Sequence, residues 1–179
     1  MQLTVLSPDK RLKASYADWF RQLNAQVAFT GSAIQCIRAD NGIRDWLTVS
    51  RMEENVSRFV ERLSRDVYER SEMRRGAMLS YVGTIEGQER PLSEGGQRLH
   101  VHLALSGISD DRDMDEVIQR ANYRWARSNW GYHETEVRRM DSEADRERWL
   151  QYLLKRFDQN RTERWITNLT AKKTLTAEK

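Results

Sequence analysis

Hydrophobic and polar residues alternate along this chain with two different periods, and these periods predict helices and strands in turn. Apolar residues recur at helical spacing between 55 and 70, whereas β-branched and apolar residues gather elsewhere in short runs typical of strands. Ser7 followed by Pro8 is a typical start for a helix. In chain order, we predict helix 7–24, strand 25–37, helix 55–70, strand 77–87, strand 98–107, helix 113–129, strand 130–140 and helix 142–157.

The order of these elements favours an α+β fold. A turn region at 88–97, with a proline and a Gly-Gly pair, separates strands 77–87 and 98–107 and predicts a hairpin. A hairpin between two helices, with further strands on either side, predicts an antiparallel β-sheet with helices on one face and the other face open. Residues 159–179 are polar and rich in Lys and Thr, so we expect one domain over 1–158 and a C-terminal tail.

Composition limits the classes of protein that fit this fold. The chain has 179 residues, with 30 Lys and Arg against 27 Asp and Glu and a net charge of +3, which permits a nucleic-acid partner without requiring one. The single Cys36 excludes an internal disulfide and a Cys-rich zinc module. We see no apolar run long enough for a signal peptide or a membrane span, so we expect a soluble protein of the cell interior.

The segment "RLHVHLALS" at 98–106 is the first candidate for chemistry, because it holds two of the three histidines in the chain. In a strand, His100 and His102 point to one side and their apolar neighbours point to the other. Two imidazoles on one face either bind one metal ion together or lie on a solvated surface. The spacing alone does not decide between these two interpretations.

A carboxylate from the hairpin partner would complete a metal site. Glu86 lies at the end of strand 77–87, and in a paired hairpin it reaches the same face as the two histidines. Two imidazoles and one carboxylate leave open positions on a divalent cation, which suits catalysis better than a structural role. Glu89 and Glu94 in the turn are competing candidates, because the sequence does not fix the register of the hairpin.

The last predicted helix carries a tyrosine outside its apolar stripe. The stripe consists of Leu150, Leu153, Leu154 and Phe157. Tyr152 falls roughly opposite this stripe, and Trp149 lies between the two faces. Three cationic side chains lie within about 60° of Tyr152 on the helical wheel: Arg148, Lys155 and Arg156. A tyrosine held on a rigid helix among cations is well placed to meet a phosphodiester; the alternative is a tyrosine on a solvated basic face.

Together these segments resemble the HUH endonuclease superfamily. "RLHVHLAL" resembles its His-hydrophobic-His motif, and "YLLK" at 152–155 is similar to the Y-x-x-K motif of its single-tyrosine replication initiators. "YVGTIEG" resembles the strand that supplies the acidic ligand of the family, and "VAFTGS" loosely resembles its first strand motif. The resemblance covers roughly residues 25–158, and the tyrosine follows the histidines as in the small rolling-circle replication proteins of plasmids, filamentous phages and other small prokaryotic viruses.

The resemblance implies a ferredoxin- or RRM-like HUH nuclease fold and a role for each motif residue. His100, His102 and Glu86 would bind Mn²⁺ or Mg²⁺, with Mn²⁺ held more tightly because two imidazoles are soft ligands for Mg²⁺. Tyr152 would be the nucleophile that forms a 5′-phosphotyrosine link, and Lys155 would lie beside the active site. The long turn at 88–97 departs from the family pattern and leaves the third ligand open.

The partners implied by the resemblance are single-stranded DNA and an origin hairpin, with Arg148 and Arg156 as contacts to the nucleic acid, in the cytoplasm of a prokaryotic host. The sequence has no G-x-x-x-x-G-K-[ST] phosphate loop, so unwinding and synthesis would come from a host helicase and polymerase or from another chain. Two alternatives remain. One is a transposase or relaxase of the same superfamily, and the other is a catalytically inactive protein that binds an origin.

Overall fold

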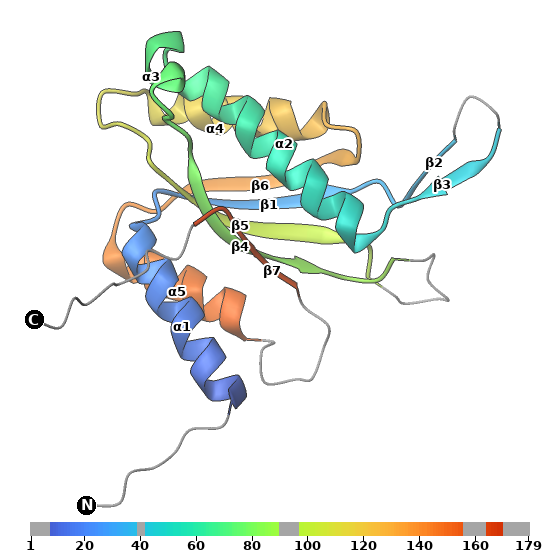
Figure 1. Ribbon diagram of the computed structural model, residues 1–179, viewed down its shortest axis with the longest axis horizontal. Helices are drawn as coiled ribbons and strands as arrows, with labels where there is room; N and C mark the ends of the chain where they lie inside the picture. Colours follow the sequence, from blue (N-terminus) through green and yellow to red (C-terminus); the bar gives the residue numbers. More distant parts are fainter. Residues whose placement is uncertain (1–7, 39–41, 90–96, 156–163, 170–179) are drawn as a thin grey trace, which may run out of the picture.

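A five-stranded antiparallel sheet forms the centre of the structure (Figure 1). The computed structural model describes residues 8–38, 42–89, 97–155 and 164–169. The strands follow the order β6-β1-β5-β4-β7, and every neighbouring pair is antiparallel. Their bounds are β1 (Val27–Ala33), β4 (Ser80–Glu86), β5 (His100–Ser106), β6 (Gly131–Arg139) and β7 (Arg164–Thr167). The predicted α+β class with an antiparallel sheet is confirmed.

Helices cover both faces of this sheet, so the expectation of helices on one face with the other face open is wrong. Figure 1 shows α2 (Val49–Val67) and α4 (Met114–Ala126) on one face, and α1 (Pro8–Leu23) and α5 (Glu143–Leu154) on the other. The physical reason is that both sides of the central strands carry apolar residues. On β5, Leu103 and Leu105 pack with α2 and α4, whereas Ala104 packs with α1 and α5.

Several helices and strands differ from those predicted from the sequence. The predicted strand 25–37 is interrupted after β1, and its end pairs as β2 (Cys36–Arg38) with β3 (Arg44–Trp46) in a ribbon that extends away from the sheet (Figure 1). The helix expected at 55–70 begins at Val49 instead, because the Thr48 hydroxyl accepts a hydrogen bond from the Arg51 amide at its N-terminus. A short helix, α3 (Arg70–Arg74), follows it.

The C-terminal segment also contributes to the sheet. Residues 164–167, which the sequence places in a polar tail, form β7 and pair with β4, so the sheet extends beyond residue 158. Trp165 of β7 stacks on Tyr16 of α1 with ring centroids 4.4 Å apart. Among the residues that the structure describes, no helix is both long enough and apolar enough to cross a membrane.

Candidate active site

The hairpin of β4 and β5 brings three potential metal ligands together. Glu86 pairs directly with His100 across the two strands, and His102 lies two residues further along the same face of β5. One ligand atom from each of these side chains lies within 4.8 Å of the other two. The register therefore places Glu86 beside both histidines, as the hairpin predicts.

The distances within this cluster suit an ion better than direct hydrogen bonds. Glu86 Oε2 lies 3.6 Å from His100 Nε2, and Glu86 Oε1 lies 3.8 Å from His102 Nε2. Both separations exceed a hydrogen-bond length and approach the separation of about 3.0–3.5 Å between neighbouring ligand atoms around a cation with bonds of about 2.1 Å. Glu86 is only 3% exposed, and a buried carboxylate requires a compensating positive charge. The cluster can therefore bind a divalent cation.

Hydrogen bonds behind the cluster orient both imidazoles. His100 Nδ1 lies 2.9 Å from the Arg98 carbonyl, which accepts only, so Nδ1 carries the proton and Nε2 presents its lone pair to the cluster. His102 Nδ1 lies 2.9 Å from the Thr30 hydroxyl of β1, which can accept the Nδ1 proton when Nε2 binds a metal ion. Metal-binding histidines typically donate their second ring N–H to such a partner. The role of Thr30 was not identified from the sequence, because nothing in "VAFTGS" distinguishes its hydroxyl.

Among the residues that the structure describes, neither competing glutamate, Glu89 or Glu94, is part of the cluster. Glu89 follows β4 in the chain, and its Oε1 accepts a hydrogen bond of 2.7 Å from the Val49 amide at the start of α2. Glu94 lies outside the described residues. Of the three glutamates considered, Glu86 is the one that the structure places in the cluster.

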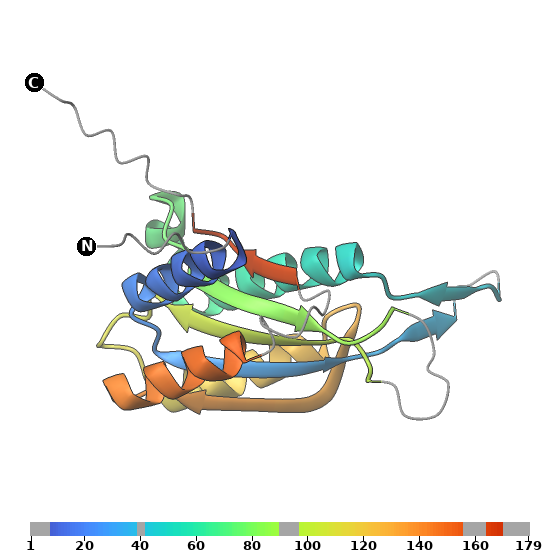
Figure 2. The ribbon, with the colours of Figure 1, turned by 90° about the horizontal axis from the view of Figure 1, so that it is seen from below.

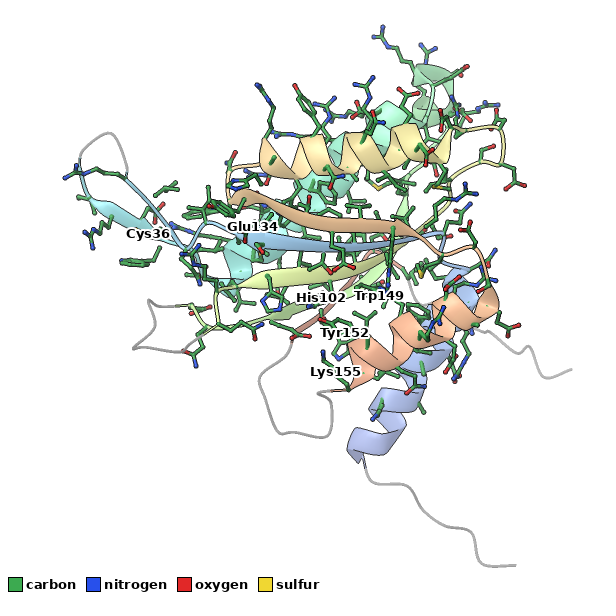
Figure 3. All side chains as sticks on the ribbon, turned by 180° about the vertical axis from the view of Figure 1, so that it is seen from behind. Cys36, His102, Glu134, Trp149, Tyr152 and Lys155 are labelled. Carbon is green, nitrogen blue, oxygen red and sulfur yellow. The ribbon has the colours of Figure 1, made fainter. Side chains whose placement is uncertain are left out.

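Helix α5 carries Tyr152 to the cluster. The helix begins at Ser142, whose hydroxyl accepts a hydrogen bond from the Asp145 amide in a capping box. The Ser142 hydroxyl, followed by Arg148, holds the pKa of Asp145 below its usual value. At the other end of the helix, Tyr152 Oη lies 3.3 Å from His102 Nε2 (Figure 3). The phenol oxygen and a candidate metal ligand are thus one hydrogen bond apart.

Of the three cationic side chains predicted to lie near Tyr152, the structure places Lys155 against the tyrosine ring. The Lys155 ammonium lies 3.6 Å from the centroid of the Tyr152 ring. Arg148 is exposed and forms an ion pair with Asp145 on its own helix, and Arg156 lies outside the described residues. Trp149, expected between the two faces of the helix, is buried.

No protein-family model matches the chain, and a search of curated proteins found no match. Among solved structures, the chain matches one described as "Minute virus of mice non-structural protein-1N-terminal nuclease domain reveals a unique Zn2+ coordination in the active site pocket and shows a novel mode of DNA recognition at the origin of replication". The two chains are 10% identical, the match covers 94% of this chain and 76% of the other, and the TM-score is 0.29.

Proposed function

We propose that this chain is a metal-dependent endonuclease that nicks and rejoins single-stranded DNA, with Tyr152 as the nucleophile. The observation that carries the proposal is the 3.3 Å contact between Tyr152 Oη and His102 Nε2. This contact joins a nucleophile on α5 to a buried cluster of Glu86, His100 and His102 that has the composition of a catalytic metal site. The motif resemblance to HUH endonucleases supports the same assignment.

The residues of the chain can carry out the reaction as follows. Tyr152 Oη forms a bond to the scissile phosphorus as the bond from phosphorus to the 3′-oxygen breaks. The phenol proton passes to water, and the leaving 3′-oxygen takes up a proton from water to become a 3′-hydroxyl. The product is a 5′-phosphotyrosine, and a later attack by a 3′-hydroxyl reverses the step and joins the strands. A divalent cation bound at the cluster would supply Lewis-acid stabilisation of the phosphate charge. Lys155 lies close enough to the phenol ring to contact the same phosphate.

The donor set also favours particular ions. Two imidazole nitrogens and one carboxylate form a softer set than the oxygen ligands that Mg²⁺ prefers, so Mn²⁺ is expected to bind more tightly than Mg²⁺. As the biological role, we propose initiation of replication at an origin hairpin, because Tyr152 follows the histidines in chain order, as in the replication initiators of the family. A host helicase and polymerase would then complete replication.

A covalent-adduct assay tests the activity. The protein is incubated with Mn²⁺ and a pool of end-labelled single-stranded oligonucleotides, and adducts are separated on a denaturing gel. We expect a labelled band with the wild-type chain, none with Tyr152→Phe, and a normal band with Tyr123→Phe. Tyr123 is a suitable control because it is an exposed tyrosine on α4, on the opposite face of the sheet.

The same assay distinguishes the proposed function from its alternatives. A wild-type protein that binds the oligonucleotides but forms no adduct with any of them would be an origin-binding protein without catalysis. An adduct that persists in Tyr152→Phe would refute the nucleophile assignment. Glu86→Gln is expected to abolish adduct formation, whereas Glu89→Gln is expected to preserve it because Glu89 contacts the start of α2.

A further inference from the structure

Trp149 connects helix α5 to the strand that holds both histidines. Its side chain is 5% exposed, and its indole Nε1–H donates a hydrogen bond of 3.2 Å to the Leu103 carbonyl of β5. Leu103 is the residue directly after His102. The indole is therefore fixed to the backbone beside one of the candidate metal ligands.

The same indole stacks on the proposed nucleophile. The rings of Trp149 and Tyr152 are nearly parallel, with an interplanar angle of 10° and centroids 5.0 Å apart. His102 presents its ring to both at steep angles, 76° to Trp149 and 82° to Tyr152. Figure 3 shows these side chains together at the end of α5 that lies over the sheet. From β6, the Arg138 guanidinium lies 5.2 Å from the centroid of the indole ring.

The position of Tyr152 in its helix explains why such a contact matters. Tyr152 lies in the last turn of α5, which ends at Leu154. The final carbonyls of a helix have no partners within the helix, so the backbone alone constrains a side chain there weakly. A tyrosine ring at this position needs contacts from neighbouring side chains to select one side-chain rotamer.

We propose that Trp149 is a positioning residue, which holds the Tyr152 ring in the orientation that directs its hydroxyl to the metal cluster. This inference rests on the proposed function, since it names the residue that places the nucleophile of that reaction. The hydrogen bond to the Leu103 carbonyl fixes the indole against β5. Because the tyrosine ring stacks on this fixed indole, its orientation is restricted as well. Trp149 itself does not contact the reacting phosphate.

The chain contains a matched control for this proposal. Trp125 of α4 is fully buried on the opposite face of the sheet, and its Nε1–H donates a hydrogen bond of 2.8 Å to the Ser32 carbonyl of β1. Trp125 and Trp149 thus form the same kind of anchor, but only Trp149 stacks on Tyr152. Trp125→Phe should disturb packing without changing the position of the tyrosine.

The test measures the distance from Tyr152 to the metal by NMR. Protein with ¹³C-labelled tyrosine rings is saturated with paramagnetic Mn²⁺ and compared with a diamagnetic Mg²⁺ sample, and the Tyr152 signal is identified by its loss in Tyr152→Phe. We expect strong Mn²⁺ broadening of this signal in the wild type and in Trp125→Phe. Trp149→Phe should show intermediate broadening, because it keeps an aromatic ring for stacking but loses the hydrogen bond to the Leu103 carbonyl. We expect clearly weaker broadening in Trp149→Met, which keeps bulk but loses the flat ring and the N–H.

Chemical shift is not the diagnostic quantity, because removal of the indole removes its ring current wherever the tyrosine lies. Unchanged Mn²⁺ broadening in Trp149→Met would overturn the proposal. Absence of nuclear Overhauser contacts between the Trp149 and Tyr152 rings in the Mg²⁺-saturated wild type would also overturn it, and this measurement does not depend on any variant folding.

Single-turnover kinetics separate this proposal from the proposed function. The rate of adduct formation should fall about tenfold or more in Trp149→Met, as expected when a reacting group is displaced by a fraction of an ångström to an ångström. The dissociation constant for the oligonucleotide should stay within about twofold, and that for Mn²⁺ should not rise, because displacement of Tyr152 only removes its contact with His102 Nε2. An unchanged rate would count against the positioning role. If the wild type forms no adduct while the Mn²⁺ broadening behaves as expected, the proposed nuclease function fails and the placement of Tyr152 by Trp149 stands.

Discussion

Replacing Tyr152 with phenylalanine should tighten the binding of Mn²⁺, because the tyrosine and the metal need the same atom. His102 Nδ1 faces the Thr30 hydroxyl, so Nε2 is the nitrogen left for a metal ion, and Tyr152 Oη lies 3.3 Å from that nitrogen. One nitrogen lone pair cannot accept a hydrogen bond and bind a cation at once. Metal binding must therefore break the contact between Tyr152 and His102.

The size of the effect follows from the strength of that contact. A hydrogen bond in a protein contributes about 0.5–1.5 kcal/mol net, and a 3.3 Å contact is longer than the usual O–H donor distance, so a value of about 0.5–1 kcal/mol is appropriate. Removal of this competitor lowers the dissociation constant by about two- to fivefold.

Isothermal titration of the DNA-free protein with Mn²⁺ measures this difference directly. Tyr123→Phe should leave the dissociation constant at the wild-type value, since Tyr123 is exposed on the opposite face of the sheet. An affinity of Tyr152→Phe that equals the wild type would show that the hydroxyl does not compete for His102. A weaker affinity would show instead that the hydroxyl helps to hold the ion, and either result refutes the reasoning.

Three further substitutions test the supports of the site. Thr30→Val removes the hydroxyl that faces His102 Nδ1 at 2.9 Å, and it should weaken Mn²⁺ binding about 10- to 100-fold in the same titration while the fold is retained. Gly87→Ala should lower both thermal stability and Mn²⁺ affinity, because Gly87 has a φ of +103° and an added Cβ would lie 2.3 Å from the carbonyl of the facing segment. Ser142→Ala should lower the free energy of unfolding by about 1 kcal/mol in urea titrations at neutral pH, since it removes the N-cap of the helix that carries the nucleophile. The pKa of Asp145 is lowered first by the Ser142 hydroxyl and then by Arg148. The part of the stabilisation that comes from the contact of Ser142 with the ionised Asp145 carboxylate is therefore present at neutral pH and is lost as the pH falls through the lowered pKa, whereas the hydrogen bond from the Asp145 amide to Ser142 does not depend on pH. The difference between Ser142→Ala and the wild type should accordingly narrow in acid.

The sequence predicts the cluster well because a hairpin leaves few choices. Alternation along a strand places His100 and His102 on one face, and antiparallel pairing brings the end of the preceding strand to the same point. What the sequence leaves open is the register, since the turn between the strands is long enough to bring Glu89 into consideration. The structure gives Glu89 a contact at the start of α2 and places Glu86 opposite His100.

The second helical layer could not be predicted in the same way. The apolar residues on the face of the sheet toward α1 and α5 are mostly small, such as Ala104, and polar residues such as Thr30 and His102 lie on the same face, so the pattern suggests an open surface. Small side chains instead allow helices to approach the sheet closely. Strand β7 was missed because its apolar part is only Trp165 and Ile166, and its pairing with β4 is a tertiary contact that no local pattern reveals.

The change from apolar to polar residues along this one face also determines where a nucleophile can act. On β5, Ala104 lies beneath the helical layer and His102 comes next on the same face, two residues or about 6.6 Å along the strand. On α5, Trp149 contacts the carbonyl beside Ala104, and Tyr152 follows three residues or about 4.5 Å later along the helix. The step along the strand is about 2 Å longer than the step along the helix, a difference that the long tyrosine side chain spans, so the tyrosine reaches the sheet where its apolar cover ends and the histidines begin. Figure 2, viewed from the side of α1 and α5, shows both helices over the same end of the sheet. One turn earlier on α5, the Trp149 ring centroid lies 5.9 Å from that of His102, whereas the Tyr152 ring lies 4.9 Å away and its hydroxyl reaches His102 Nε2 at 3.3 Å. Position 152 is therefore better placed than position 149 to serve the cluster.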